Sequence, residues 1–176
     1  MLTTDQKGVI AEQAIAFEAI RAGLGVYLPL GDERCDLILD VRPGLLRVQC
    51  KWAVLRNGVV VIRTRTCRRG REGLIHRSYE PGEIDVIAAY CDGLERCYLL
   101  PTELSVGRAA VQLRVDPCLN NQRLRIHWAR DFEFGATIQR LKGPIAQLGE
   151  RYLGMVEVAG SSPAGSTSYV SPTQTR

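Results

Sequence analysis

Apolar and polar side chains alternate most clearly between residues 35 and 52. Every second residue is apolar from Cys35 to Val41 and again from Leu46 to Trp52, and Arg42-Pro43-Gly44 separates the two runs. Because successive side chains of a strand point to opposite faces of a sheet, this period of two predicts an antiparallel hairpin. One face then carries Cys35, Leu37, Leu39, Val41, Leu46, Val48, Cys50 and Trp52, and the other carries Asp36, Ile38, Asp40, Leu45, Arg47, Gln49 and Lys51. The charged groups of both strands therefore share one surface.

A helical period precedes the hairpin, over residues 5–21. Thr3 and Gln6 have the spacing of a capping box at the start of this helix. One stripe of apolar residues at helical spacing is expected to pack against the rest of the protein, namely Ile10, Ala14, Phe17 and Ile20.

Glu12 lies almost opposite this stripe, where its neighbours at helical spacing are small or apolar: Gly8, Ile15, Ala16 and Ala19. One interpretation is that these residues are good helix formers and that the glutamate faces water. The other is that small side chains let the helix approach a sheet closely, so that Glu12 faces a partner there. We favour the second, because long acidic side chains are seldom buried without a partner.

Turn and strand signals predict the rest of the domain. Asn57-Gly58 favours a tight hairpin turn, and Pro29 and Pro101 are expected to end strands. Apolar residues between 102 and 115 have helical spacing, through Leu104, Ala109, Val111 and Leu113. We therefore expect strands at 26–28, 59–66, 86–90, 95–100 and 124–128, and a second helix at 102–115.

Arginine is concentrated between residues 63 and 77, where glycines at 70 and 73 favour a flexible loop. Such a run is usually a solvated surface. Guanidinium groups also suit phosphate well, and clustered arginine is the electrostatic footprint of a nucleic-acid contact. Because the arginines are clustered on one element, we favour binding to the phosphates of DNA by Arg63, Arg65, Arg68, Arg69, Arg71 and Arg77.

The 176 residues carry 23 basic and 19 acidic side chains, a net charge of +4. Residues 142–176 contain three basic and two acidic side chains, which leaves +3 for residues 1–141. This charge is modest, so any basic surface has to be local. The length suits one domain with its own core.

Six cysteines stand at positions 35, 50, 67, 91, 97 and 118, without a Cys-x-x-Cys pair. This spacing disfavours a structural zinc site or a small cysteine-rich redox protein, and buried free thiols are the simplest interpretation. The sequence has no secretory signal peptide and no apolar run of membrane-spanning length. It therefore predicts a protein of the reducing cytoplasm without membrane contact.

Residues 142–176 differ from the rest in composition, being rich in Gly, Ser, Thr and Pro from Gly143 onward. Such a composition predicts a disordered tail, and hence a domain that ends at residue 141. Residues 145–151, 152–156 and 160–163 can be spelled by codons that resemble the D-arm, anticodon stem and T-loop of a transfer RNA gene. The tail is then a translation of neighbouring genomic sequence, which reading that DNA would test.

The hairpin also carries a more specific pattern than alternation. Asp36 stands at the start of its first strand and Gln49-Cys50-Lys51 on its second, which resembles the metal-dependent nucleases of the PD-(D/E)XK family. Most of that family has Asp or Glu where this chain has Gln49. The Gln variant occurs in the homing endonucleases associated with group I introns, which this chain resembles most. Further matches to that group, over residues 3–134, are Lys7, Gly8, Glu12, Tyr79, Gly82, Ile84, Asp85, Tyr98 and Pro101.

This resemblance implies an α/β fold, a restriction-endonuclease-like core with a central mixed β-sheet flanked by helices. It also implies hydrolysis of phosphodiester bonds in double-stranded DNA with Mg²⁺, a hard cation that prefers oxygen ligands. Glu12 and Asp36 would be metal carboxylates, Gln49 a neutral ligand or water-orienting group, and Lys51 the electrostatic catalyst. Lys7 joins the arginines as a DNA contact. One such site cuts one strand, so a double-strand break implies a homodimer or homotetramer and a near-palindromic target.

Other functions share these features. A solvated polar face is what an ordinary hairpin presents, and Gln49 could mark the decay of a nuclease into a noncatalytic nucleic-acid-binding module. A junction resolvase or a restriction enzyme would carry the same hairpin, because target specificity depends on groove contacts that no motif encodes. Asp85 could be a helper acid, although a cap or structural turn residue is the favoured interpretation.

Overall fold

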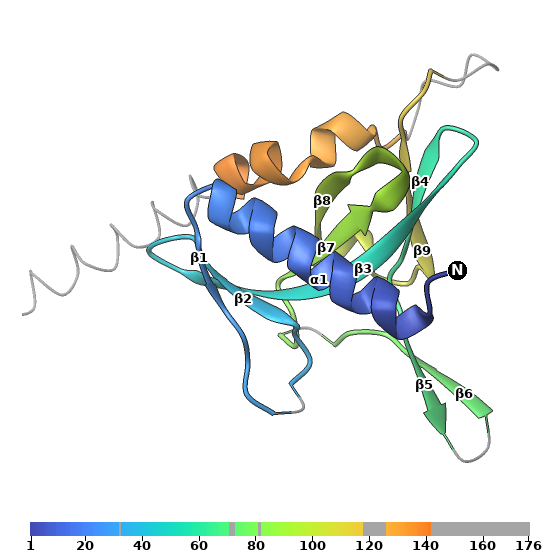
Figure 1. Ribbon diagram of the computed structural model, residues 1–176, viewed down its shortest axis with the longest axis horizontal. Helices are drawn as coiled ribbons and strands as arrows, with labels where there is room; N and C mark the ends of the chain where they lie inside the picture. Colours follow the sequence, from blue (N-terminus) through green and yellow to red (C-terminus); the bar gives the residue numbers. More distant parts are fainter. Residues whose placement is uncertain (32, 71–72, 81, 118–125, 142–176) are drawn as a thin grey trace, which may run out of the picture.

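A mixed β-sheet of seven strands forms the centre of the molecule (Figure 1). The computed structural model describes residues 1–31, 33–70, 73–80, 82–117 and 126–141, with only the backbone for 67–70 and 74–76. The sheet order is β1-β2-β3-β4-β9, with β7 paired to β3 and β8 paired to β7. Its strands are β1 (Gly25–Tyr27), β2 (Leu37–Asp40), β3 (Leu45–Arg56), β4 (Val59–Arg63), β7 (Val86–Cys91), β8 (Arg96–Pro101) and β9 (Ala110–Arg114). The mixed sheet and its antiparallel hairpin agree with the prediction.

The long strand β3 organises the sheet. It pairs antiparallel with β2 over residues 45–48, antiparallel with β4 over 53–56, and parallel with β7 over 48–53. Residues 49–52 of β3 therefore lie between the stretches paired with β2 and β4, and all four pair with β7. Gln49 and Lys51 belong to this stretch.

Both predicted turns of the meander are present. Asn57 and Gly58 have positive φ angles of 48° and 70°, as a two-residue hairpin turn of this kind requires. At the other turn, the amide of Val41 donates to the carbonyl of Gly44 at 3.0 Å.

Helix α1 (Thr4–Arg21) crosses one face of the sheet and contacts chiefly β3 and β7 (Figure 1). The predicted capping box is confirmed, because Thr3 and Gln6 exchange hydrogen bonds of 2.9 and 3.2 Å. At its other end, Gly23 adopts φ 74° and the Gly23 and Leu24 amides bind the carbonyls of Ile20 and Ala19. This Schellman arrangement ends the helix and directs the chain into β1.

The predicted packing stripe of α1 was wrong. The helix buries Ala11, Ile15 and Ala19, whereas Phe17 and Ile20 are each 62% exposed. Two of the three buried side chains are alanines, which lets this face of the helix lie close to the sheet, and the larger Phe17 and Ile20 remain exposed. The face that carries Glu12 is therefore the one turned towards the sheet.

Two apolar clusters cover the two faces of the sheet. The cluster on the α1 side includes Ile15 of the helix, together with Leu37, Val48 and Cys50 from the predicted apolar face of the hairpin. The other side includes Ala53, Ile62, Ile87, Tyr98, Leu100 and Leu113. Cys35 belongs to this second cluster, contrary to the prediction, because β2 begins only at Leu37 and its alternation does not extend back to residue 35.

A helix at residues 134–141 was not predicted. Phe134 and Ile138 are buried in the cluster on the α1 side, and Leu141 packs against it. Their spacing of four and three residues is the helical period that the sequence interpretation overlooked. The 3₁₀ turn η3 (Ala129–Phe132) leads into this helix, and further 3₁₀ turns are η1 (Asp92–Leu94) and η2 (Thr102–Leu104).

The expected helix at 102–115 was also wrong. Only η2 is helical there, and the segment continues as β9, which pairs antiparallel with β4. Val111 and Leu113 are buried while Gln112 is exposed, which is the period of two of a strand. The prediction was wrong because the apolar residues of this segment also fit a helical spacing.

The arginine-rich segment, expected as a loop, forms an antiparallel ribbon of β5 (Thr66–Gly70) and β6 (Gly73–Arg77) that projects from the sheet (Figure 1). Strand β4 accordingly ends at Arg63 rather than at residue 66. The predicted strand at 124–128 lies partly outside the described residues; within them, Trp128 forms a parallel bridge with Arg114. The predicted tail, 142–176, lies outside them entirely. No helix in the described ranges is both long and apolar enough to cross a membrane.

Candidate active site

Asp36 lies directly before β2, where that strand separates from β3. Its amide donates to the carbonyl of Val48 at 2.8 Å, and its Oδ2 accepts the Cys50 amide at 2.7 Å. The same Oδ2 accepts a hydrogen bond from Nε2 of Gln49, which is only 9% exposed. The Asp36 carboxylate thus accepts the Cys50 amide of β3 in the way that a main-chain carbonyl of a neighbouring strand would. Its hydrogen bonds with Cys50 and Gln49 fix its position.

The surroundings of Asp36 disfavour its negative charge. Burial raises the pKa of Asp36, and the hydrogen bond from Cys50 and the charge of Lys51 offset this only in part. A cation bound beside the carboxylate would remove this penalty, because an opposite charge at short range favours the ionised form.

Glu12 approaches the same place from α1. Burial raises the pKa of Glu12, and the nearby charge of Asp36 raises it further. The charge of Asp36 therefore acts on Glu12, although the two carboxylates belong to elements far apart in the sequence. Gly8 does not explain the close approach of the helix, because a Cβ atom built there meets nothing within 4 Å. Ala11, Ile15 and Ala19 make that approach instead.

Lys51 extends from the same face of β3 as Gln49. It is partly buried, and burial lowers the pKa of its ammonium group while the charge of Asp36 acts in the opposite direction. Its Nζ lies 5.3 Å from the ring centroid of Tyr79. Asp36, Gln49 and Lys51 are therefore adjacent, and the polar face of the hairpin is not uniformly solvated at this end.

Tyr79, Arg34 and Glu83 also reach the site, and the sequence interpretation gave them no role there. The guanidinium Cζ of Arg34 lies 5.1 Å from the Tyr79 ring centroid, and its Nε lies 3.3 Å from Glu83. Glu83 also pairs with Arg77 at 2.8 Å. The match of Tyr79 to the family pattern was the one signal in the sequence that could have drawn attention to this group.

The predicted DNA contacts do not all gather at the site. The Nζ of Lys7 lies 5.9 Å from the Trp52 ring centroid, and Arg77 is paired with Glu80 and Glu83. Arg63 and Arg65 are exposed near the base of the ribbon. The side chains of Arg68, Arg69 and Arg71 lie outside the described part of the structure.

Asp85 is engaged in an ion pair that holds two strands together. Its carboxylate accepts hydrogen bonds from the Arg47 amide at 2.8 Å, from Nε at 3.0 Å and from Nη2 at 2.8 Å. These bonds hold the pKa of Asp85 below its usual value. The geometry agrees with the structural role favoured for Asp85 and ties the start of β7 to the hairpin.

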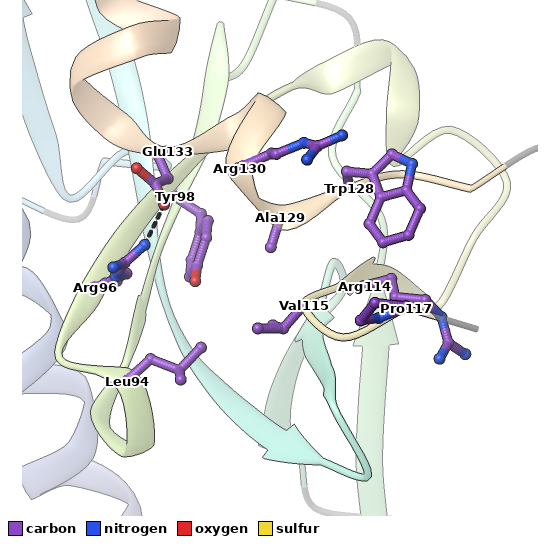
Figure 2. A pocket seen from close by; sticks show the side chains of 10 residues that line it. All are labelled: Leu94, Arg96, Tyr98, Arg114, Val115, Pro117, Trp128, Ala129, Arg130 and Glu133. Atoms are coloured by element: carbon purple, nitrogen blue, oxygen red, sulfur yellow. Dashed lines mark hydrogen bonds and ion pairs between the residues drawn. The ribbon is translucent and has the colours of Figure 1, made fainter. Parts of the chain in front are cut away.

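A cavity of about 460 Å³ lies apart from these residues, between β8, β9 and η3 (Figure 2). Figure 2 shows Arg96 paired with Glu133 at one side and Arg130 beside Trp128 at the other. None of its ten lining residues is among the predicted site residues. The candidate chemistry therefore lies outside this hollow.

The cysteines of the described ranges are not grouped with other metal-binding side chains. Cys35, Cys50, Cys91 and Cys97 are free thiols there, and no three His, Cys, Asp or Glu side chains of those ranges are grouped as metal ligands. The donors brought together are two carboxylates and one amide, from Glu12, Asp36 and Gln49.

The comparison with known proteins agrees with this geometry. The sequence profile described as PD-(D/E)XK endonuclease matches residues 2–135, close to the 3–134 expected from the motifs. The chain belongs to the PD-(D/E)XK endonuclease family. Members of this family generally use divalent metal ions.

One solved structure that resembles this PD-(D/E)XK endonuclease is the bacterial homing endonuclease I-Ssp6803I. The two share 27% sequence identity with a TM-score of 0.63, over 85% of this chain and 97% of that one. The restriction-endonuclease-like fold is thereby confirmed. No curated protein sequence matches the chain significantly.

Proposed function

We propose that this endonuclease hydrolyses phosphodiester bonds of double-stranded DNA with Mg²⁺ held by Glu12, Asp36 and Gln49. The observation that supports this most is the Asp36 carboxylate, bound to the Cys50 amide and approached by Glu12 from α1. Partial burial raises the pKa of both acids, and the charge of Asp36 raises that of Glu12 further, so the pair is costly to keep ionised unless a cation joins them. Their donor atoms are the oxygen ligands that a hard divalent cation prefers.

The charges at the site also suit this cation. Glu12 and Asp36 supply two negative charges and Gln49 supplies none, so the three residues together balance one divalent ion. Rotation of the Gln49 amide by 180° would turn its Oε1 towards the ion, and the carbonyl of Cys50 is a further oxygen nearby. When bound, the metal ion would polarise a phosphoryl oxygen and lower the pKa of a coordinated water.

Lys51 has a different task. Its partly buried ammonium lies near Asp36, on the face of β3 that Gln49 shares. A positive charge held there stabilises the negative charge that develops on the phosphate during hydrolysis, and partial burial strengthens this effect. Lys51 is therefore the electrostatic catalyst of the proposed reaction.

Double-strand cleavage would need two such sites. We propose a homodimer or homotetramer whose symmetry matches a near-palindromic DNA target of the kind that intron homing uses. Its mass in solution, measured by analytical ultracentrifugation, is expected to be two or four times that of one chain. A monomer at micromolar concentration would contradict this part of the proposal.

Cleavage of supercoiled DNA that carries the genomic flanks of the gene tests the activity. The wild-type protein is expected to nick or linearise it with Mg²⁺ and to leave it intact with EDTA. Lys51→Ala is expected to lower the rate by about 10²–10³-fold, the usual cost of losing one electrostatic contact to the transition state. Binding without cleavage under every divalent ion would favour the noncatalytic binding module instead.

A further inference from the structure

The hydroxyl of Tyr79 is buried beside the candidate site, yet it has no hydrogen-bond partner in the described part of the protein. A buried hydroxyl usually finds such a partner, because leaving it without one costs free energy. The contacts that the described structure shows for this side chain are therefore made by its aromatic ring.

That ring lies against both nearby cations. The Nζ of Lys51 is 5.3 Å and the Cζ of Arg34 is 5.1 Å from its centroid. Both distances are within the range of about 6 Å over which an aromatic ring attracts a cation. The ring also packs against the apolar cluster of the second sheet face, which limits its movement.

Ion pairs hold the segment that carries the ring. Glu83 pairs with Arg34 on one side and with Arg77, the last residue of β6, on the other. The Glu80 amide donates to Glu83 at 2.9 Å, which closes the turn after Tyr79. An anchored aromatic ring is a suitable support for lysine, whose flexible stem otherwise samples many rotamers.

We propose that Tyr79 is a positioning residue for Lys51, and that its ring holds the ammonium group beside Asp36. This inference rests on the proposed function, in which Lys51 is the electrostatic catalyst. A displacement of about 1 Å in a catalytic group can cost about 10²-fold in rate. Tyr79 therefore contributes to the rate of cleavage rather than to the affinity for DNA.

Chemical modification measures the contact without DNA or metal. The chain has only three lysines, Lys7, Lys51 and Lys142, so acylation can be followed at each by mass spectrometry. Tyr79→Leu is expected to raise the acylation rate of Lys51 at least about threefold, because a cation–π contact that holds it is lost. Tyr79→Phe keeps the ring, and the wild-type rate is expected.

Lys7 is the internal control, since it lies over Trp52 and its rate should be the same in all variants. An unchanged Lys51 rate in Tyr79→Leu would overturn the proposal. If this variant does not fold, as judged by circular dichroism, Tyr79→Met takes its place with the same expectation.

Kinetics then separate positioning from a general structural role. Tyr79→Leu is expected to lower kcat by about 10- to 100-fold with KM changed by less than about threefold, whereas Tyr79→Phe keeps most of the activity. Because the missing hydroxyl had no partner, the melting temperature of Tyr79→Phe should not fall below that of the wild type.

Equal losses of kcat in Tyr79→Phe and Tyr79→Leu would contradict the positioning role. A wild-type protein that cuts no DNA would refute the proposed function instead. The acylation rates would still decide whether Tyr79 holds Lys51, so the two failures are distinguishable.

Discussion

At Asp36 the fold keeps an acidic side chain where its charge is disfavoured. The carboxylate serves β3 as a hydrogen-bond acceptor for Cys50 and, in the proposed reaction, binds the cation. Burial raises its pKa, so the metal-free protein loses stability when Asp36 ionises. Such a conflict between stability and function is common where activity depends on a strained site.

Asp36→Asn is expected to abolish cleavage, lowering the rate by at least about 100-fold, and to raise the melting temperature in EDTA at pH 8. The folded-state pKa of Asp36 is raised, so its stabilising contribution is fully present below the unfolded pKa and is lost as pH rises through the folded one. The gain from Asn should therefore shrink as the pH is lowered. Thermal melts of both proteins at several pH values measure it.

Glu103 is exposed, and Glu103→Gln serves as the control because it removes one negative charge away from the candidate site. An equal gain in stability from this control would show that net charge, rather than the burial of Asp36, is responsible.

Gln49→Glu would introduce the acid that most of the family carries. It replaces a buried donor to Asp36 with a third negative charge, so the melting temperature in EDTA should fall. An added carboxylate ligand should lower the Mg²⁺ concentration for half-maximal cleavage by at least about tenfold. Metal titrations of cleavage and of thermal stability measure both effects.

Gln112→Glu adds the same charge at an exposed position of β9 and is expected to change neither quantity. Gln49 would not be a metal neighbour if this control also lowered the Mg²⁺ concentration for half-maximal cleavage. The same would follow if Gln49→Glu left that concentration unchanged.

At the scale of elements, β3 pairs with β2, β4 and β7, and a tight turn stands at each of its ends. Gly58 closes the β3–β4 turn with φ 70°, and a Cβ atom there would clash with Oδ2 of Asp116 and lie 3.0 Å from the Cβ of that residue. The turn is therefore constrained both by its backbone conformation and by the chain that follows β9.

Gly58→Ala is expected to destabilise the protein by more than the roughly 1 kcal/mol that left-handed backbone alone costs a non-glycine residue. Gly107→Ala is the matched control, since Gly107 has the same φ of 70° with no atom within 4 Å of its added Cβ. Urea denaturation gives both free energies of unfolding. Equal losses in the two variants would mean that Asp116 moves aside without cost.

At the scale of the whole molecule, the described core extends to the helix at residues 134–141. Phe134 and Ile138 close the cluster on the α1 side, and the family match ends at residue 135. Leu141, the last described residue, packs against this cluster, and the end of the domain at residue 141 stays a prediction.

Removal of residues 142–176 is expected to leave the melting temperature and the rate of DNA cleavage unchanged within error. The full-length protein, assayed beside the shortened one, is the control. A loss of stability on truncation would mean that the tail packs on the domain, and it would contradict the interpretation of the tail as translated flanking sequence.

Local features of the chain were predictable because they depend on near neighbours. The period of two at residues 37–50, the capping box of Thr3 and Gln6, and the Asn57-Gly58 turn are all set by steric and hydrogen-bonding preferences within a few residues. The spacing of Asp36, Gln49 and Lys51 belongs to the same class, since strand register alone brings them to one end of the hairpin.

Features that depend on distant partners were decided by the tertiary structure. The face of α1 that packs, the conversion of 110–114 into a strand beside β4, and the meeting of Glu12 with Asp36 all require the sheet to be in place. Tyr79 and Arg34 stand 45 residues apart and meet beside Lys51 for the same reason. The sequence by itself determined the hairpin and its charged residues, because these follow from local geometry. Only the tertiary structure decided which face of α1 packs on the sheet and which aromatic ring joins the charged residues, because both depend on close packing between segments far apart in the sequence.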